Sequence, residues 1–143
     1  MRKRTTAREM AVKILYQAEI TRREIKIAAD NFWKEAETID KIVFEFTKRL
    51  TVGIEEHSKE IDEKISRYAT NWQLKRMAVI DRNVLRIGVF ELLFAPDIPP
   101  KVTINEAVEL AKKYGDLDSS KFVNGILDKI HKTEILVKNE QYS

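Results

Sequence analysis

Apolar side chains recur at intervals of three and four residues along almost the whole chain. This spacing places them on one face of an α-helix. The stripes predict seven helices and one short helical turn, over residues 7–18, 25–36, 39–54, 58–68, 72–77, 81–95, 103–114 and 118–130. No stretch of six residues alternates apolar and polar side chains, so the sequence predicts no strand. The expected fold class is all-α, with about seven helices in one packed unit.

Polar residues near the expected helix starts provide capping signals. Thr6 and Glu9 form one capping box, and Thr103 and Glu106 form another. Three more side chains are placed to cap a helix, namely Ser58, Asp81 and Asp118. Gly115 is expected to end its helix in the left-handed conformation.

The composition fits one globular domain over residues 1–143, with 43% hydrophobic and 34% charged residues. No apolar run approaches the roughly 18 residues of a membrane-spanning helix, and Glu91 interrupts the best candidate. No apolar segment follows the basic N-terminus, so no secretory signal is expected. Cysteine is absent, which excludes disulfides and Cys-ligated metals, and a cytoplasmic location is expected. Periodicity ends near Thr133, so residues 133–143 are expected to fray.

The positive charge is concentrated at the start of the chain. Residues 1–26 carry eight basic and three acidic residues, a net charge of +5, whereas residues 27–70 carry −3 and residues 71–143 carry +1. A basic arm over residues 1–6 that leads into a helix can bind phosphates of nucleic acid. A solvated, frayed terminus would show the same charges, so charge alone leaves both interpretations open.

The sequence contains no recognised catalytic or cofactor-binding motif. Asp128 lies three residues before His131, as in the Glu-x-x-His step of di-iron bundles, but Ile54 occupies the matching place before His57. We therefore expect no catalytic residue, no metal and no cofactor, and a binding protein rather than an enzyme.

Aromatic residues beside cations are typical of proteins that stack single-stranded RNA bases. Phe122 follows Lys121 in the first turn of an expected helix, where it can be exposed or can belong to the core stripe. Tyr68 closes another stripe and is expected to pack with its hydroxyl outward. Trp33 and Trp72 are interpreted as core residues.

Two parts of the chain together resemble the NusB family. The first is Arg4-x-x-Ala-Arg-Glu-x-Ala-x-x-x-Leu-Tyr16. The second combines LRIGVFEL at residues 85–92, KVTINEAVELAKKYG at 101–115 and DSSKFVNGILD at 118–128. The similarity extends from Arg4 to about Ile130, and the middle helices match in pattern only.

This resemblance implies two small helical bundles packed across each other, and no catalysis. It implies binding to single-stranded boxA RNA of ribosomal RNA transcripts as a heterodimer with NusE, a small-subunit ribosomal protein. RNA polymerase and other Nus factors would be indirect partners in antitermination and termination of transcription. The implied RNA contacts are Arg2, Lys3, Arg4, Arg8, Tyr68, Asp118, Lys121 and Phe122. The implied NusE contacts are Tyr16, Asp81 and Arg86.

The sequence leaves more than one interpretation of several residues and of the function. Asp81 is also a candidate helix cap, and Arg86 can instead anchor its helix internally. Gly88 would permit close helix approach for packing alone. A helical protein-binding scaffold without RNA specificity is the alternative function, and a homodimer is a further alternative when NusE is absent. An rRNA cytosine methyltransferase with a domain of this kind would need a Cys nucleophile, which this sequence lacks.

Overall fold

The computed structural model of the chain describes residues 2–70 and 73–136, and Trp72 lies outside this part. It contains α1 (Arg2–Thr21), α2 (Ile25–Lys34), α3 (Lys41–Glu56), α4 (Ser58–Tyr68), a 3₁₀ turn η1 (Leu74–Arg76), α5 (Val79–Phe94), α6 (Pro100–Tyr114), α7 (Ser119–Ile130) and a π-helical segment η2 (His131–Leu136). No strand occurs in these residues, so the predicted all-α class with seven helices is confirmed.

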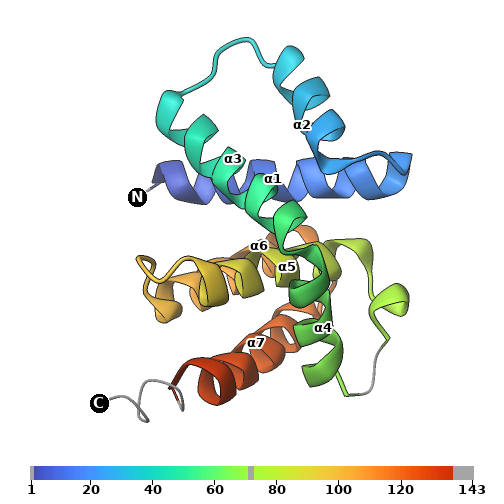
Figure 1. Cartoon of the computed structure of the whole chain (residues 1–143), viewed down its shortest axis with the longest axis vertical. Coiled ribbons are helices and arrows are strands. Elements are labelled where there is room, and N and C mark those ends of the chain that lie inside the picture. The colour runs from blue at the N-terminus through green and yellow to red at the C-terminus, as the bar shows by residue number, and fades with distance from the viewer. Residues whose placement is uncertain (1, 71–72, 137–143) are drawn as a thin grey trace.

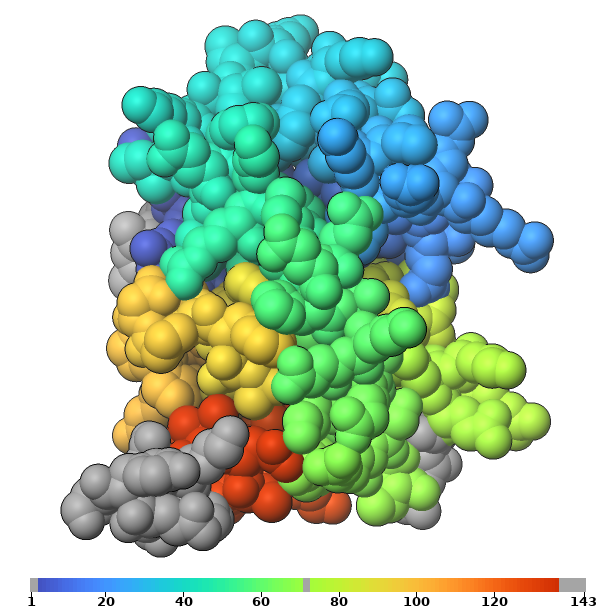
Figure 2. All heavy atoms as spheres, in the orientation of Figure 1, coloured from blue at the N-terminus to red at the C-terminus, as the bar shows by residue number. Residues whose placement is uncertain are grey.

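The helices form two bundles (Figure 1). Helices α1, α2 and α3 make the upper one, and α4 to α7 make the lower one. Helix α3 leads through His57 into α4, and α1 lies across α5 where the bundles meet. The surface in Figure 2 shows the same division, with α3 and α4 running down the front face from one bundle to the other.

One apolar core runs through both bundles. Fully buried members come from the upper bundle, such as Ala11 and Leu50, and from the lower bundle, such as Leu85 and Leu127. Each large side chain buried in this way contributes about 1.5–3 kcal/mol to folding. A Cβ built on Gly88 would lie 2.6 Å from Leu127 Cδ1, so the predicted close approach of α5 and α7 at this glycine is confirmed. A smaller cluster under α2 holds the predicted core residue Trp33, which is half-buried there.

The predicted helix caps are mostly wrong because the helices begin earlier than their capping boxes. Helix α1 already begins at Arg2, which places Thr6 in its interior. Pro100 begins α6, and a proline there has its φ angle preset for a helix. Thr103 therefore lies inside α6, where its hydroxyl donates to Glu91 at 2.8 Å. Asp81 lies in the first turn of α5 rather than at its N-cap.

Three other end signals also differ from the prediction. Asp118 stands at the N-cap of α7, but its side chain makes no capping hydrogen bond. Ser58 is the first residue of α4, after its N-cap His57. Gly115 is extended, with φ −102° and ψ −167°, so it is not left-handed. Asp40, which the sequence analysis missed, caps α3 by accepting from the backbone N–H groups of residues 42 and 43.

The structure of the two chain ends also differs from the prediction. Residues 2–6 of the expected basic arm form the first turns of α1. At the other end, the chain stays helical through Leu136 in η2, and residues 137–143 lie outside the described part. In the described residues, no helix is both long enough and apolar enough to cross a bilayer.

Candidate nucleic-acid interface

A buried charge network joins the two bundles at Arg8. The Arg8 side chain is 2% exposed, and its Nε and Nη2 groups donate to Glu91 Oε2 and Oε1 at 2.7 and 2.8 Å. Its Nη1 group donates to Glu106 at 3.2 Å. Glu91 is itself 1% exposed and also accepts from Thr103. These bonds connect α1 to α5 and α6 through charges that have been removed from water.

Arg8 therefore does not present its guanidinium at the surface in this structure. The resemblance to the NusB family implied Arg8 as an RNA contact. Its three nitrogen atoms all donate to carboxylates of the same chain. Arg8 is therefore not part of the RNA surface that we propose for this chain.

The first cations of α1 also have partners within the chain. Lys3 is exposed and pairs with Asp40 at 3.0 Å. The exposed Arg4 guanidinium lies 4.5 Å from the centre of the Phe46 ring, as in a cation–π contact. Nothing is described of the Arg2 side chain. The N-terminal charge is thus partly compensated before any ligand arrives.

A pocket of about 480 Å³ opens where α5 and α7 begin. It brings together three of the predicted residues, Asp81, Asp118 and Phe122. Other lining residues, among them Arg76, Met77 and Asp116, were not predicted from the sequence. No sequence motif marked these residues, because η1 brings Arg76 and Met77 to the pocket from a separate segment of the chain. We refer to this site as the Asp81–Phe122 pocket.

The local fold explains how these side chains converge. The Asp116 backbone N–H donates to Ser119 Oγ at 2.9 Å, which closes the turn before α7. Phe122 follows in the first turn, half-buried and packed against the main core, so its ring lines the pocket from a fixed position. Asp81 Oδ1 is buried and has no hydrogen-bond partner among the described residues. Lys121 is exposed next to Phe122.

Tyr68 lies at a different place, near the end of α4. Its hydroxyl donates to Glu134 Oε2 at 2.5 Å, and this bond raises the pKa of Tyr68. Lys64 pairs with the same carboxylate at 3.0 Å. Tyr68 thus holds η2 to α4 and does not line the Asp81–Phe122 pocket.

The predicted NusE contacts differ in whether their side chains are exposed or held by other residues of the chain. Tyr16 is 39% exposed on α1. Arg86 is instead held by Asp62 and Glu19, at 2.8 and 3.0 Å, so the predicted internal anchor is confirmed. Arg82 also binds Glu19. Burial would raise the pKa of Glu19, but the hydrogen bonds and charges of Arg82 and Arg86 outweigh it, and the pKa is lowered.

The described residues form a small all-α protein with a surface pocket at the start of α5 and α7. Among them, no group of three or more His, Cys, Asp and Glu side chains is placed to hold a metal ion. Comparison with known sequences identifies the family. The sequence model of the NusB family matches residues 5–132. The chain belongs to the NusB family.

Relatives and solved structures agree with this assignment. A transcription antitermination protein NusB of Anaeromyxobacter dehalogenans is 48% identical over 128 residues, covering 90% of this chain and 89% of its own. A NusB of Bacillus cereus is 43% identical over 132 residues, covering 92% and 98%. The T. maritima NusB structure superposes with a TM-score of 0.84 at 46% identity, covering 91% of each chain. A NusB in a complex of the antitermination factors NusB and NusE with double-stranded RNA gives a TM-score of 0.84 at 32% identity, covering 92% and 98%.

Proposed function

We propose that the chain is a non-enzymatic, RNA-binding transcription factor of the cytoplasm. It binds boxA RNA of ribosomal RNA transcripts as a heterodimer with NusE, and it supports processive antitermination by RNA polymerase. Support comes from relatives named as antitermination proteins and from a structural neighbour bound to NusE and RNA. The observation that carries the proposal is the aromatic ring of Phe122 in a surface pocket beside exposed cations.

The chemistry of the pocket suits an unstacked base better than a phosphate. Phe122 offers an apolar ring, and base–aromatic stacking contributes about 1–3 kcal/mol per base. Asp81, Asp116 and Asp118 repel phosphate but accept hydrogen bonds from base N–H groups. The flanking phosphates would then lie against Lys121 and Arg76 at the edge.

The other predicted residues have different roles in this proposal. Lys3 and Arg4 are exposed but partnered, so they contribute long-range attraction rather than a fixed contact. Tyr68 has a structural role through Glu134. Tyr16 is the proposed NusE contact, and Ile20, 55% exposed one helical turn later, extends this apolar strip on α1.

The proposal is tested by binding of the NusE complex to fluorescently labelled single-stranded boxA RNA. Phe122→Ala should weaken binding by about 5- to 150-fold, the equivalent of one lost base stack. Phe122→Trp should keep most of the affinity because it retains a ring. Phe94→Ala is the matched control, since Phe94 is also half-buried but lies on the groove beside His57.

Two results would overturn parts of the proposal. Equal affinities of Phe122→Ala and Phe94→Ala would remove the pocket from the RNA surface. Equal binding of boxA and a scrambled RNA by the wild-type complex would favour the alternative, a helical protein-binding scaffold without RNA specificity.

A further inference from the structure

A second polar cleft lies between the C-terminal half of α1 and α2. It encloses about 420 Å³, which is within the usual size range of small-ligand sites. Its lining includes Gln17, Thr21, Arg23, Asn31, Phe32 and Glu35. An aromatic ring, two amides, a guanidinium and a carboxylate thus face one small space. We refer to this site as the α1–α2 cleft.

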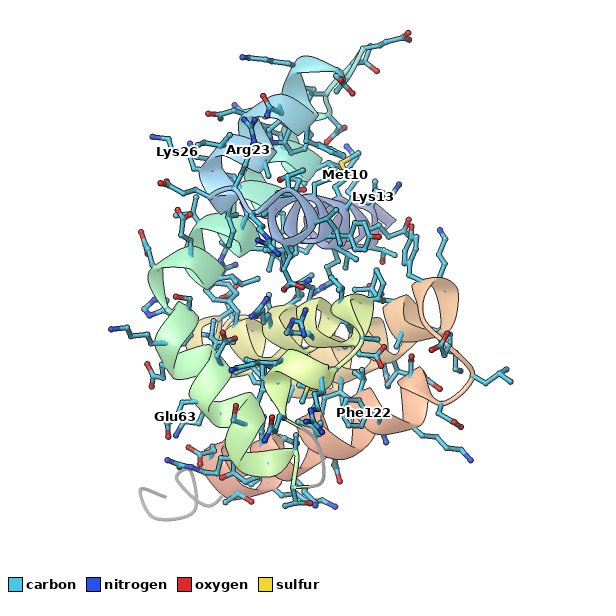
Figure 3. The ribbon with its side chains drawn as sticks, turned by 90° about the vertical axis from the view of Figure 1, so that its right-hand side faces the viewer. Met10, Lys13, Arg23, Lys26, Glu63 and Phe122 are labelled. Carbon is cyan, nitrogen blue, oxygen red and sulfur yellow. The ribbon has the colours of Figure 1, made fainter. Side chains whose placement is uncertain are left out.

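Exposed cations follow the end of α1 and continue into the first turn of α2, and one of them, Arg23, lines the cleft. Arg22, Arg23 and Lys26 are exposed, and none of them forms an ion pair with any residue that the structure describes. Figure 3 views the molecule from the side where α1 ends, with Arg23 and Lys26 on the upper bundle and Phe122 on the lower one. This concentration of free positive charge differs from the start of α1, where Lys3 has an acidic partner.

The backbone at Arg22 gives an independent indication that its side chain is needed. Arg22 has a φ of 56°, the left-handed conformation that usually selects glycine at a helix end. The turn is closed by backbone bonds from Arg22 to Glu19 at 3.3 Å and from Arg23 to Ala18 at 3.0 Å. An arginine pays a conformational cost here that glycine would avoid. The favourable effect of a cation at a helix C-terminus does not require this position, because Arg23 already supplies it.

We infer that the α1–α2 cleft binds one nucleotide of an RNA strand, with its base inside and its phosphates on Arg23 and the adjacent Arg22. The inference rests on the proposed RNA-binding function and adds a second contact to it. Gln17 and Asn31 each offer a donor and an acceptor for a base edge, and Phe32 offers a ring. Glu35 excludes phosphate from the interior and favours a base with an exocyclic amino group.

The cleft suits RNA better than an acidic protein segment. A carboxylate of a peptide would meet Glu35 inside the cleft, whereas a base can donate to it. The amides would gain little from an apolar peptide side chain, because their donors and acceptors would be left unpaired.

The inference is tested on the NusE complex with two labelled RNAs, the boxA element alone and boxA with its natural flanking nucleotides. Wild-type protein should bind the longer RNA more tightly. Arg22→Gly and Arg23→Gln should each lower the slope of log affinity against log salt by about one for the longer RNA. Asn31→Ala should reduce affinity for the longer RNA by about 5- to 150-fold with little change for boxA alone.

Controls separate this inference from its alternatives. Lys59→Gln removes an exposed cation on α4 that has no ion-pair partner in the described part of the chain, and it should leave both affinities unchanged. Arg22→Gly is the most informative variant, since unchanged RNA affinity in a protein that is still folded would show that the Arg22 side chain has no role in RNA binding, which would overturn the inference. Loss of NusE binding without RNA in Arg23→Gln would show a protein contact and would also overturn it. Phe122→Ala, measured alongside, shows whether the primary RNA site fails as well.

Discussion

The two ends of α1 both carry clustered cations, but the structure treats them differently. At the N-terminal end, Lys3 pairs with Asp40, and Arg8 is buried against Glu91. At the C-terminal end, Arg22 and Arg23 are exposed and have no ion-pair partner in residues 2–70 and 73–136. The sequence shows one basic segment, whereas the fold divides it into charges that hold the protein together and charges that remain for a ligand.

The difference follows from what each end packs against. The first half of α1 lies over α5 and α6, whose acidic residues Glu91 and Glu106 face it. Taking a charge out of water is costly unless it is paired, so Arg8 needs these partners. Arg22 and Arg23 follow the end of α1 at Thr21 and are exposed, so water solvates both cations at no such cost.

The largest expected effect is on stability at Arg8. Arg8→Met should lower the free energy of unfolding by about 3–5 kcal/mol, because Glu91 is left as a buried charge without a partner. Arg23→Gln should change it by no more than about 0.5 kcal/mol, as expected for an exposed side chain. Urea denaturation of both variants measures the contrast.

A double variant checks the cause of this effect. Arg8→Met combined with Glu91→Leu should recover much of the lost stability, because the unpaired charge disappears with its partner. If Arg8→Met alone is as stable as Arg23→Gln, the cations at the two ends of α1 do not differ in their contribution to folding, which would contradict this comparison.

A smaller effect is expected at Glu19, which binds Arg82 and Arg86 from the later part of α1. Glu19→Gln should cost about 1–2 kcal/mol at neutral pH, since Glu19 is partly solvated. The pKa of Glu19 is lowered in the folded state, so its contribution is present above the unfolded value near 4.5 and is lost as the pH falls through the folded pKa. The variant should therefore show a flatter loss of stability below pH 4.5. If the free energy of unfolding of the variant fell as steeply below pH 4.5 as that of the wild type, the prediction would be contradicted.

A gain in stability is expected at Arg22, directly after the C-terminus of α1. Arg22→Gly should stabilise the protein by about 0.5–1 kcal/mol, because glycine adopts the left-handed conformation without steric cost but is more flexible when unfolded. Thermal unfolding measures the change. A destabilised variant would mean that the Arg22 side chain makes a contribution to folding that its exposure does not suggest.

The smallest effect concerns Asp97 near the start of α1. The hydrogen bond from Arg49 lowers the pKa of Asp97 to about 2, and the charge of Arg4 contributes less. The contribution of this carboxylate is complete above its ordinary pKa of 3.8 and is lost as the pH falls toward about 2. Arg49→Gln should move the pKa most of the way back, whereas Arg4→Gln should raise it slightly. An NMR titration of the Asp97 carboxyl carbon distinguishes these shifts, and equal shifts would contradict the ranking.

The periodicity of apolar residues predicted the helices well because burial of one helix face dominates their stability. Helix ends were predicted poorly, since Thr6 and Thr103 resemble caps while tertiary contacts and Pro100 extend their helices further. The resemblance singled out Phe122 and Asp118, and both line the Asp81–Phe122 pocket.

Buried charge was the main feature that sequence patterns missed. Glu91 interrupts an apolar run, and a lone acid at such a position implies a cationic partner in the core. That signal could have pointed to a buried arginine, but not to Arg8 among several candidates. The three-dimensional arrangement of Arg76 and Asp116 had no sequence signal at all.

An NMR titration of the NusE complex with flanked boxA RNA tests the central claim most directly. We predict the largest amide shifts around Phe122 and Asp118, further shifts around Arg23 and Asn31, and small shifts at Lys3 and Arg4. The largest shifts at Lys3 and Arg4, with none around Phe122, would contradict the assignment of the RNA surface.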